Sequence, residues 1–247
     1  MVPESHDHEH VADDVVARHL GGPATRRTFV LGTLAFLAGC STAGRTDQLP
    51  GIVWTDPAAA PRGDVTAARP RMAARGNVIS RSAWAKGGCI PSNMNRMQPV
   101  QRITIHHDGM DSFTTTSQSA ASARLERIRR GHLARGAWGD IGYHYAIDRG
   151  GRVWECRDLR YQGAHVKGRN EGNIGILVMG NFDVGRPSSA QLRSLASQVS
   201  ALCAAHGISK TSRGVRSHKE WSSASTLCPG RNLQPEFVKL RDRGFRA

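Results

Sequence analysis

The chain has 247 residues, and its apolar periodic segments lie almost entirely after residue 76, which predicts one globular domain. A unit from Asn77 to Ala247 would bury roughly 70% of its unfolded surface, so it needs no disulfide or metal in order to fold. The formal net charge of +14 predicts attraction to polyanions, but it does not discriminate among nucleic acid, anionic lipid and acidic cell-wall polymers. An arginine-biased composition with a solvated surface explains the same charge.

Residues 1–20 combine histidines and acidic residues with few apolar ones, which favours disorder over a loose metal site. Arg26 and Arg27 then precede an apolar run, Phe29–Ala38, that is too short for a membrane span of about 20 residues and suits the core of a signal peptide. The segment, which ends at Cys40, resembles a twin-arginine export signal with a lipoprotein box. A buried helix of the domain is the alternative, but Pro, Gly and Arg residues on both sides argue against it.

On this interpretation residues 1–40 comprise the twin-arginine lipoprotein signal with its disordered start, and Cys40 becomes the lipidated first residue of the mature protein. Residues 41–75 are rich in Ala, Pro, Gly and Arg without a sustained period, so they form a flexible linker to a domain at residues 76–247. The residue after the lipidated cysteine is Ser41, whereas an aspartate at that position retains many lipoproteins at the inner membrane. We therefore expect an exported protein, lipid-anchored at the cell envelope, in the periplasm or at the outer membrane facing the wall.

The first strand of the domain is predicted at Val100–His107, a β-branched run that ends in two histidines. Alternation along the strand places His106 and His107 on opposite faces, so only one of them can serve a metal. We expect His106 to do so and His107 to be packed or hydrogen-bonded in the interior.

The segment SHKEWSSASTLCPG contains His218 and Cys228 ten residues apart, with a proline closing the loop. Together with His106 they offer two nitrogen ligands and one sulfur ligand for Zn²⁺. Three protein ligands leave one tetrahedral position for water, which is the catalytic form of a zinc site. The sequence therefore predicts a zinc hydrolase.

An amphipathic helix is predicted over Thr116–Arg135, because apolar residues recur there at helical spacing. His132 near its end is expected to be structural. The arginines of this helix are expected on its wet side, where a solvated face explains them more simply than a polyanion site does: Arg124, Arg127, Arg129 and Arg130.

Alternation of Tyr143, Tyr145 and Ile147 before a glycine turn predicts a β-hairpin. A tyrosine at the start of a strand is usually a packing residue, but its hydroxyl can also hold a zinc-bound water or a developing oxyanion. Tyr143 is therefore a candidate catalytic residue.

A continuous apolar run at Asn173–Phe182 predicts a strand covered on both faces. A helix follows it, with a capping box of Ser188 and Gln191 and a closing glycine at Gly207. A last helix is predicted at about Pro235–Arg243. Strands that alternate with helices predict an α/β fold, with a central mixed β-sheet flanked by helices on both faces.

The five cysteines include no CxxC pair, which argues against a zinc finger or a thioredoxin-like redox centre. With Cys40 lipidated, Cys228 on the metal and Cys203 packed in the core, only Cys89 and Cys156 remain. An exported protein permits a disulfide between these two. Two separately buried thiols explain the sequence nearly as well.

Five segments between Val78 and the C-terminus form a recognisable set: SRSAW, ITIHH, AWGDIGYHYAIDRGGRVWECRD, GAHVKGRNEGNIGILVMGNF and SHKEWSSASTLCPG. In this order they resemble the zinc-dependent N-acetylmuramoyl-L-alanine amidases, a family that includes phage lysozyme-amidases and peptidoglycan recognition proteins. Each segment alone is a weak match, but five in sequence are strong. The resemblance implies a zinc hydrolase that cleaves the amide between N-acetylmuramic acid and the L-alanine of peptidoglycan.

The resemblance places the zinc ligands on His106, His218 and Cys228 and the active-site tyrosine on Tyr143. It implies a catalytic role for Thr226, two residues before the ligand cysteine, where the family carries lysine or threonine. The ten-residue spacing from His218 to Cys228 is longer than in many close relatives, which leaves the position of Thr226 open. Residues along the substrate groove of relatives correspond to His165, Asn170 and Asn173.

Two other functions compete with the enzyme. A non-catalytic lipoprotein that binds peptidoglycan would share the fold, although such proteins usually lack a metal ligand and this chain has all three. A nucleic-acid binder is disfavoured by the export signal and by an aromatic content of 6%, which offers few stacking platforms. We expect a monomer whose partners are muramyl peptides and, through the lipid anchor, a membrane.

Overall fold

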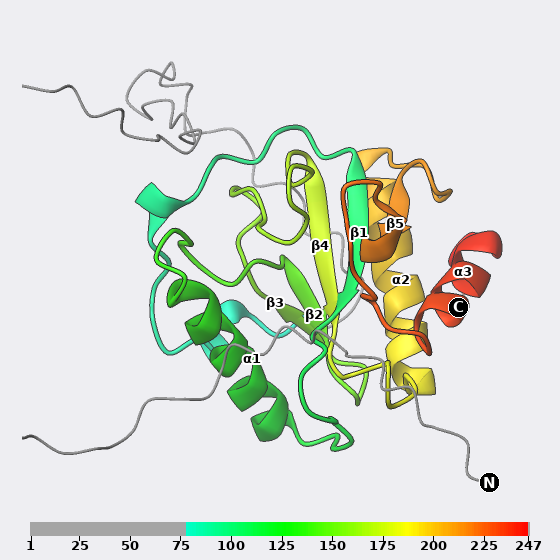
Figure 1. Cartoon of the computed structure of the whole chain (residues 1–247), viewed down its shortest axis with the longest axis horizontal. Helices are drawn as coiled ribbons and strands as arrows, with labels where there is room; N and C mark the ends of the chain where they lie inside the picture. Colours follow the sequence, from blue (N-terminus) through cyan, green and yellow to red (C-terminus); the bar gives the residue numbers. More distant parts are fainter. Residues whose placement is uncertain (1–77, 247) are drawn as a thin grey trace, which may run out of the picture. The chain divides into compact units, whose positions relative to one another are not determined.

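A computed structural model of the chain describes residues 78–246 (Figure 1). The predicted twin-arginine signal, the lipidated Cys40 and the linker at residues 41–75 lie outside the described residues. Two short 3-10 turns open the described part, η2 (Arg81–Ala83) and η3 (Pro91–Asn93). None of the helices between residues 78 and 246 is both long and apolar enough to cross a membrane.

Five strands form one mixed sheet in the order β3-β2-β4-β1-β5. Parallel pairing joins β2 to β4, β4 to β1 and β1 to β5, and β3 runs antiparallel to β2. The predicted hairpin is therefore confirmed, and Gly151 in its turn has a φ of 83°, which glycine adopts without strain. The strands are β1 (Arg102–His107), β2 (Tyr145–Ile147), β3 (Val153–Glu155), β4 (Asn173–Val178) and β5 (Val215–Ser217).

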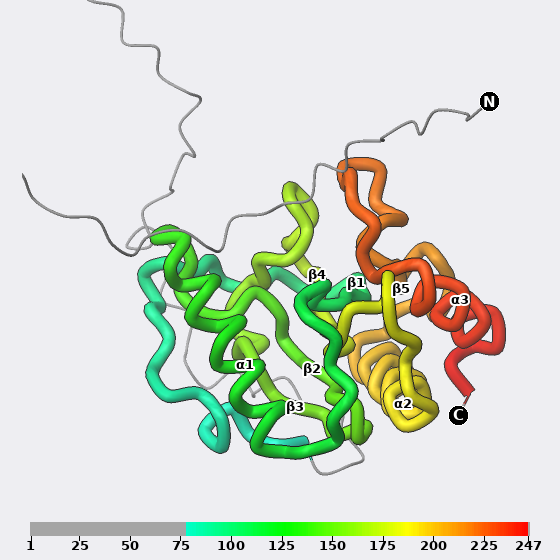
Figure 2. Tube along the Cα trace, turned by 60° about the horizontal axis from the view of Figure 1, so that its bottom comes forward, coloured from blue at the N-terminus to red at the C-terminus, as the bar shows by residue number. Residues whose placement is uncertain are grey.

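Helices cover both faces of this sheet: α1 (Gln118–Leu133) on one face, and α2 (Ser189–His206) with α3 (Gln234–Asp242) on the other. The isoleucines of β1 and β4 pack against α2 and α3, whereas Ala146 and Leu177 pack under α1. Figure 2 shows the strands running between α1 and α2. The predicted α/β fold with a mixed sheet and helices on both faces is confirmed.

Local sequence signals set the ends of the two longer helices. Ser117 accepts the N–H of Ala120 at 3.3 Å and begins α1. Ser188 and Gln191 form the predicted capping box of α2, and Gly207 ends that helix in the left-handed conformation. A side-chain cap satisfies N–H groups that the first turn leaves without a partner, so these residues define where each helix starts.

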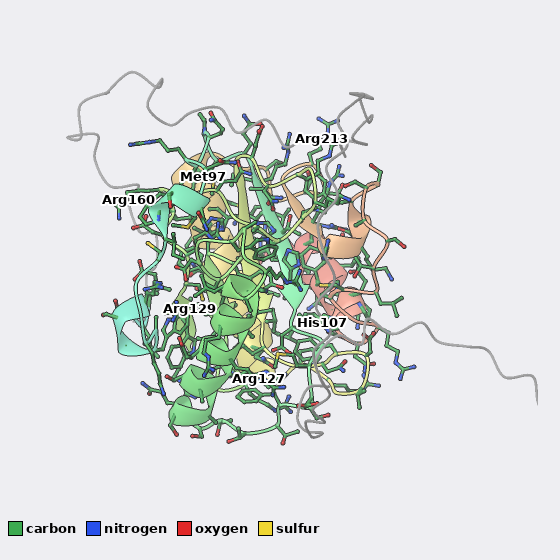
Figure 3. All side chains as sticks on the ribbon, turned by 60° about the vertical axis from the view of Figure 1, so that its left-hand side comes forward. Met97, His107, Arg127, Arg129, Arg160 and Arg213 are labelled. Carbon is green, nitrogen blue, oxygen red and sulfur yellow. The ribbon has the colours of Figure 1, made fainter. Side chains whose placement is uncertain are left out.

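The arginines of α1 do not all face solvent as predicted. Arg124 is buried with hydrogen bonds to Asp108 at 2.9 and 2.6 Å, and Arg129 is buried with hydrogen bonds to Glu126 at 2.9 and 3.0 Å. Arg127, labelled with Arg129 in Figure 3, has a side chain that is 63% exposed. The prediction is wrong for Arg124 and Arg129 because each has a carboxylate partner that allows a guanidinium to leave solvent.

The cysteines of the described part are all free thiols. Cys203 lies on the buried side of α2 and packs in the core, as predicted. Cys156 is fully buried and donates its S–H to the carbonyl oxygen of Trp154 at 3.8 Å, whereas Cys89 is half-buried. The structure therefore contains two separate thiols in place of a Cys89–Cys156 disulfide.

Candidate metal centre

The carboxyl end of β1 supplies the first residue of a polar cluster. His106 lies on the α1 face of the sheet, beside Leu177, and is 1% exposed. His107 lies on the opposite face, where its Nδ1 accepts the backbone N–H of Phe182 at 3.1 Å. The predicted alternation of the two histidines is confirmed, and His107 has the packed, hydrogen-bonded role expected of it.

His218 is the first residue of the 3-10 turn η4 (His218–Glu220), which directly follows β5. Because β1 and β5 are parallel neighbours, their carboxyl ends bring His218 close to His106, and the two ring centroids are 4.6 Å apart. Glu220, at the end of the turn, accepts hydrogen bonds from Arg241 of α3 at 2.6 and 3.0 Å. The last helix thus holds the turn that carries His218.

Cys228 lies in the loop between η4 and α3, which returns to the end of β1. Its carbonyl oxygen accepts the N–H of Lys219 at 2.9 Å, and its own N–H donates to Oγ1 of Thr226 at 3.1 Å. The N–H of His107 lies 3.4 Å from its sulfur. The loop is therefore fixed by η4 on one side and by β1 on the other.

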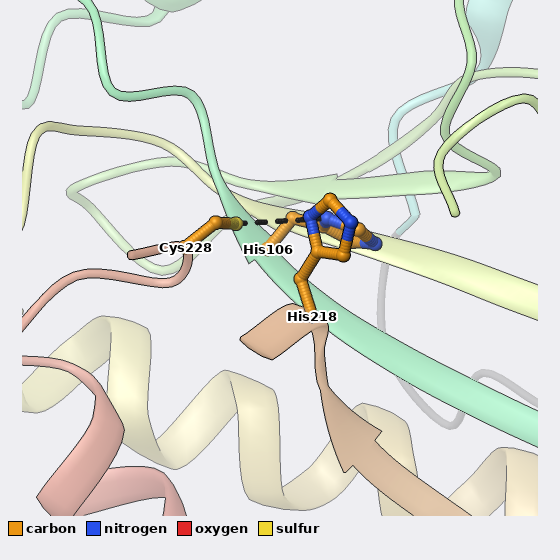
Figure 4. Close-up of side chains that lie close together, drawn as sticks. All are labelled: His106, His218 and Cys228. Atoms are coloured by element: carbon orange, nitrogen blue, oxygen red, sulfur yellow. Dashed lines mark hydrogen bonds between the residues drawn. The ribbon is translucent and has the colours of Figure 1, made fainter. Parts of the chain in front are cut away.

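The structure brings the three predicted ligands together (Figure 4). One ligand atom each from His106, His218 and Cys228 lies within 4.8 Å of the other two, and Nδ1 of His106 is 3.7 Å from the sulfur of Cys228. Zinc bonds of about 2.0 Å to nitrogen and about 2.3 Å to sulfur place tetrahedral donors roughly 3.5 Å apart. Small side-chain movements therefore fit the cluster to Zn²⁺, which prefers nitrogen and sulfur, rather than to Mg²⁺ or Ca²⁺, which take oxygen.

Burial keeps these ligands neutral. It holds the pKa of His106 well below its usual range, with His165 and His218 adding to the effect, and it also lowers the pKa of His218. Burial raises the pKa of the Cys228 thiol to about 12, against the opposing effect of the His107 N–H. Neutral imidazoles offer lone pairs to a metal at pH 7, whereas Cys228 must lose its proton when a metal binds.

Tyr143 borders the cluster, two residues before β2. Its ring centroid is 5.2 Å from that of His106 and 5.8 Å from that of His132. Burial raises the pKa of its hydroxyl, with a smaller contribution from the nearby Cys228, so the hydroxyl stays protonated and able to donate a hydrogen bond at neutral pH. His132 accepts the N–H of Gly142 at 3.0 Å, which is the structural role predicted for it.

The family of N-acetylmuramoyl-L-alanine amidases matches residues 96–231, which is more than half of the chain. This chain belongs to that family. The matched range runs from before β1 to the loop after Cys228, so it includes all three candidate ligands of this amidase-family chain.

Individual relatives carry two kinds of name. A peptidoglycan-recognition protein of Drosophila simulans is 31% identical over 166 residues, which cover 67% of this chain and 88% of that protein. The human N-acetylmuramoyl-L-alanine amidase is 26% identical over 132 residues, which cover 53% of this chain and only 23% of the human protein. The structure of bumblebee PGRP-SA is 28% identical with a TM-score of 0.58, and the match covers 65% of this chain and 93% of that one.

Of the other predicted site residues of this amidase-family chain, His165 and Thr226 contact the candidate ligands, and His165 and Asn173 are buried. His165 is 9% exposed, and Asn170 accepts its backbone N–H at 2.9 Å. Asn173 is fully buried in β4, with its side-chain amide bonded at both ends, so it has no exposed surface for a substrate to contact. Thr226 accepts the backbone N–H of the ligand cysteine.

The pair of Glu220 and Arg241 that supports His218 was not predicted from the sequence. One signal was present: Ser217 and Glu220 have the S-x-x-E spacing of a capping box, which predicts a helical turn starting at His218. Arg241 lies 21 residues beyond Glu220 and has no local signal, because its contact depends on how α3 packs against β5.

Proposed function

We propose that this chain is a zinc-dependent amidase that hydrolyses the amide between N-acetylmuramic acid and the L-alanine of peptidoglycan. The observation that carries the proposal is the set of two imidazoles and one sulfur gathered where β1 and β5 end. Membership in the N-acetylmuramoyl-L-alanine amidase family supports the choice of substrate, as do relatives named for peptidoglycan recognition.

His106, His218 and Cys228 are the residues that would hold the metal. Zinc held by three protein ligands supplies a Lewis acid and lowers the pKa of a bound water to near 7. The chain contributes rigid supports for all three ligands: strand β1, the turn η4 braced by Arg241, and the Cys228 loop bonded to Lys219. Groups that are already in position need little reorganisation during the reaction.

Tyr143 is the proposed hydrogen-bond donor to the carbonyl oxygen of the scissile amide. Negative charge develops on that oxygen as water adds, and a positioned donor stabilises it by roughly 3 kcal/mol. The raised pKa of Tyr143 keeps its hydroxyl proton available for this contact. In this proposal Thr226 shapes the loop of Cys228, since its hydroxyl oxygen accepts the cysteine N–H.

Digestion of purified peptidoglycan sacculi tests the proposal. Zinc-loaded protein is expected to release stem peptides that carry a new L-alanine amino terminus, identified by mass spectrometry. The Cys228→Ser variant is expected to release none while keeping the circular dichroism spectrum of the wild type. A wild-type protein that binds sacculi without releasing these peptides would instead support the second candidate, a non-catalytic recognition protein.

We further propose that the protein is exported and lipid-anchored at the cell envelope through Cys40. The twin arginines Arg26 and Arg27 and the short apolar run before Cys40 support this localisation. In cell fractionation the full chain is expected with the membranes and the Cys40→Ser variant in the soluble exported fraction. Wild-type protein recovered only from the cytoplasm would refute both export and anchoring.

A further inference from the structure

The ring of His165 is hydrogen-bonded to His106 on one side and to β4 on the other. Its Nδ1 lies 3.0 Å from Nε2 of His106, and its Nε2 lies 3.1 Å from the carbonyl oxygen of Asn173. His165 is 9% exposed, His106 is 1% exposed and Asn173 is fully buried. They form a continuous chain of hydrogen bonds that is shielded from solvent.

The carbonyl group at the end of this chain decides where the protons lie. A carbonyl oxygen only accepts, so Nε2 of His165 carries a hydrogen and donates it to Asn173. An imidazole that carries its hydrogen on Nε2 has a lone pair on Nδ1. Nε2 of His106 must then donate to that lone pair, which leaves Nδ1 of His106 unprotonated.

The other side of the His106 ring agrees with this assignment. Its Nδ1 faces the sulfur of Cys228 at 3.7 Å, where a thiol hydrogen can be donated to an unprotonated nitrogen. The opposite tautomer would place a hydrogen on Nδ1 and turn the lone pair of Nε2 toward the lone pair of His165. Two buried acceptors would then face each other without a proton between them, which is unfavourable.

Two glycines make room for the His165 ring. A Cβ atom on Gly163 would lie 2.5 Å from Cδ2 of His165, and a Cβ atom on Gly175 would lie 2.6 Å from the same atom. Asn170 fixes the backbone at this point by accepting the N–H groups of His165 at 2.9 Å and Val166 at 2.8 Å. The imidazole is therefore confined between two stretches of backbone, in an orientation that a side chain at either glycine would disturb.

Asn173 is itself held on both ends of its side chain. Its Oδ1 accepts the hydroxyl of Thr104 at 3.0 Å, and its Nδ2 donates to the carbonyl oxygen of Arg169 at 2.7 Å. The hydroxyl oxygen of Thr104 also accepts the indole N–H of Trp221 at 3.0 Å, and the backbone N–H of Trp221 donates to the carbonyl oxygen of His218. One network thus connects the segments that carry both histidine ligands.

We propose that His165 is a positioning residue that selects the tautomer of His106 and thereby presents Nδ1 of His106 to the metal, an inference that deepens the proposed amidase function and depends on it for the identity of the metal. In this role His165 contacts the ligand His106 on the side of its ring away from the metal, whereas the family resemblance implies a contact with the substrate. Loss of such a partner on the second nitrogen of a ligand histidine typically weakens metal binding by about 10- to 100-fold.

Two variants of similar size separate the hydrogen-bond acceptor from the bulk of the side chain. His165→Asn places an amide oxygen near the position of Nδ1, whereas His165→Leu offers no acceptor. In competition with a chromogenic chelator, the leucine variant is expected to bind Zn²⁺ about 10- to 100-fold more weakly and the asparagine variant within about threefold of the wild type. Wild-type zinc affinity in His165→Leu would overturn the proposal, and a raised KM for muropeptide beside it would assign His165 to the substrate.

Nitrogen NMR of the metal-free wild-type protein tests the tautomer without any variant. His106 is expected to show a protonated Nε2 and an unprotonated Nδ1, with a hydrogen-bond coupling from Nε2 to Nδ1 of His165. A protonated Nδ1 on His106 would overturn the proposal. Because this measurement needs neither zinc nor substrate, it stays decisive even if the sacculus digest releases no stem peptides and the amidase function fails.

Discussion

Arg241 contacts Glu220 through both of its terminal nitrogens, at 2.6 and 3.0 Å. Its Nη1 group also donates to the carbonyl oxygen of Val215 at 3.2 Å. One side chain of α3 therefore joins the last strand to the turn that begins with His218. The position of a proposed zinc ligand depends on this contact, although Arg241 lies outside the metal cluster.

The Arg241→Met variant is expected to lower the free energy of unfolding by about 2 kcal/mol, because the half-buried Glu220 loses its charged donors. Zinc affinity should also fall, since η4 is less firmly held. Urea unfolding and chelator competition measure the two effects. Lys239→Met is the control, because the exposed Lys239–Glu236 pair contributes about 0.5 kcal/mol or less. Equal losses in both variants would show that the Glu220 contact has no special role.

Zinc is expected to stabilise the folded chain, because it binds a site that the unfolded chain lacks. A ligand at 100 times its Kd adds about 2.7 kcal/mol to the free energy of unfolding. Thermal unfolding with zinc and with EDTA should reveal this increment in the wild type and in Cys89→Ser, whose thiol lies outside the cluster. The increment should largely disappear in Cys228→Ser. A full increment in that variant would exclude the sulfur as a ligand.

Removing the hydroxyl of Tyr143 is expected to slow hydrolysis without affecting the metal. The Tyr143→Phe variant should have a kcat about 100-fold lower, which corresponds to a loss of roughly 3 kcal/mol of transition-state stabilisation. Its zinc affinity should match that of the wild type. Tyr145→Phe is the matched control, because Tyr145 packs in the core with α2, on the face of the sheet away from His106. Similar rates for both variants would leave Tyr143 without a catalytic role.

Local patterns were sufficient to predict most of the fold. The capping box of Ser188 and Gln191 and the glycine at Gly207 mark the ends of α2 because each satisfies or redirects the backbone next to it. The alternation along β1 predicts the faces of His106 and His107 for the same reason, since neighbouring residues of a strand point in opposite directions.

The three candidate ligands were also predictable, because His106 ends a strand, His218 and Cys228 lie in one loop, and imidazole and thiolate are the groups that zinc prefers. The roles of His165 and Asn173 were not. Their hydrogen bonds join β4 to a loop and to β1, and no spacing in the sequence reveals such contacts. The same limit explains Arg124, since helical periodicity cannot show that Asp108 of another segment will bond to it.

The buried ion pair of Arg124 and Asp108 is expected to be important for stability. Arg124→Met leaves Asp108 without its charged partner, and breaking a buried pair in this way typically costs about 3–5 kcal/mol. Arg127→Met, on the same helix, is the control. Arg127 is largely exposed and lies 3.6 Å from an exposed Asp111, so its loss should cost about 0.5 kcal/mol or less. Urea unfolding of both variants measures the difference, and equal values would contradict it.

Acid is expected to destabilise the metal-free protein through His144. Its Nδ1 accepts the N–H of Gly175 and its Nε2 donates to the carbonyl oxygen of Tyr161, both at 3.0 Å, so the ring suits its site only when neutral. Burial lowers its pKa from 6.5 to about 4. Between pH 4 and pH 6.5 the unfolded chain binds more protons than the folded chain. The contribution of His144 to stability is therefore complete above pH 6.5 and falls by up to about 1.4 kcal/mol per pH unit toward pH 4.

Urea unfolding at about pH 7.5 and about pH 5 measures this loss of stability. The loss should be smaller in His144→Asn than in the wild type, because asparagine keeps an acceptor for Gly175 but does not titrate. An identical loss in both proteins would assign the acid sensitivity to other groups.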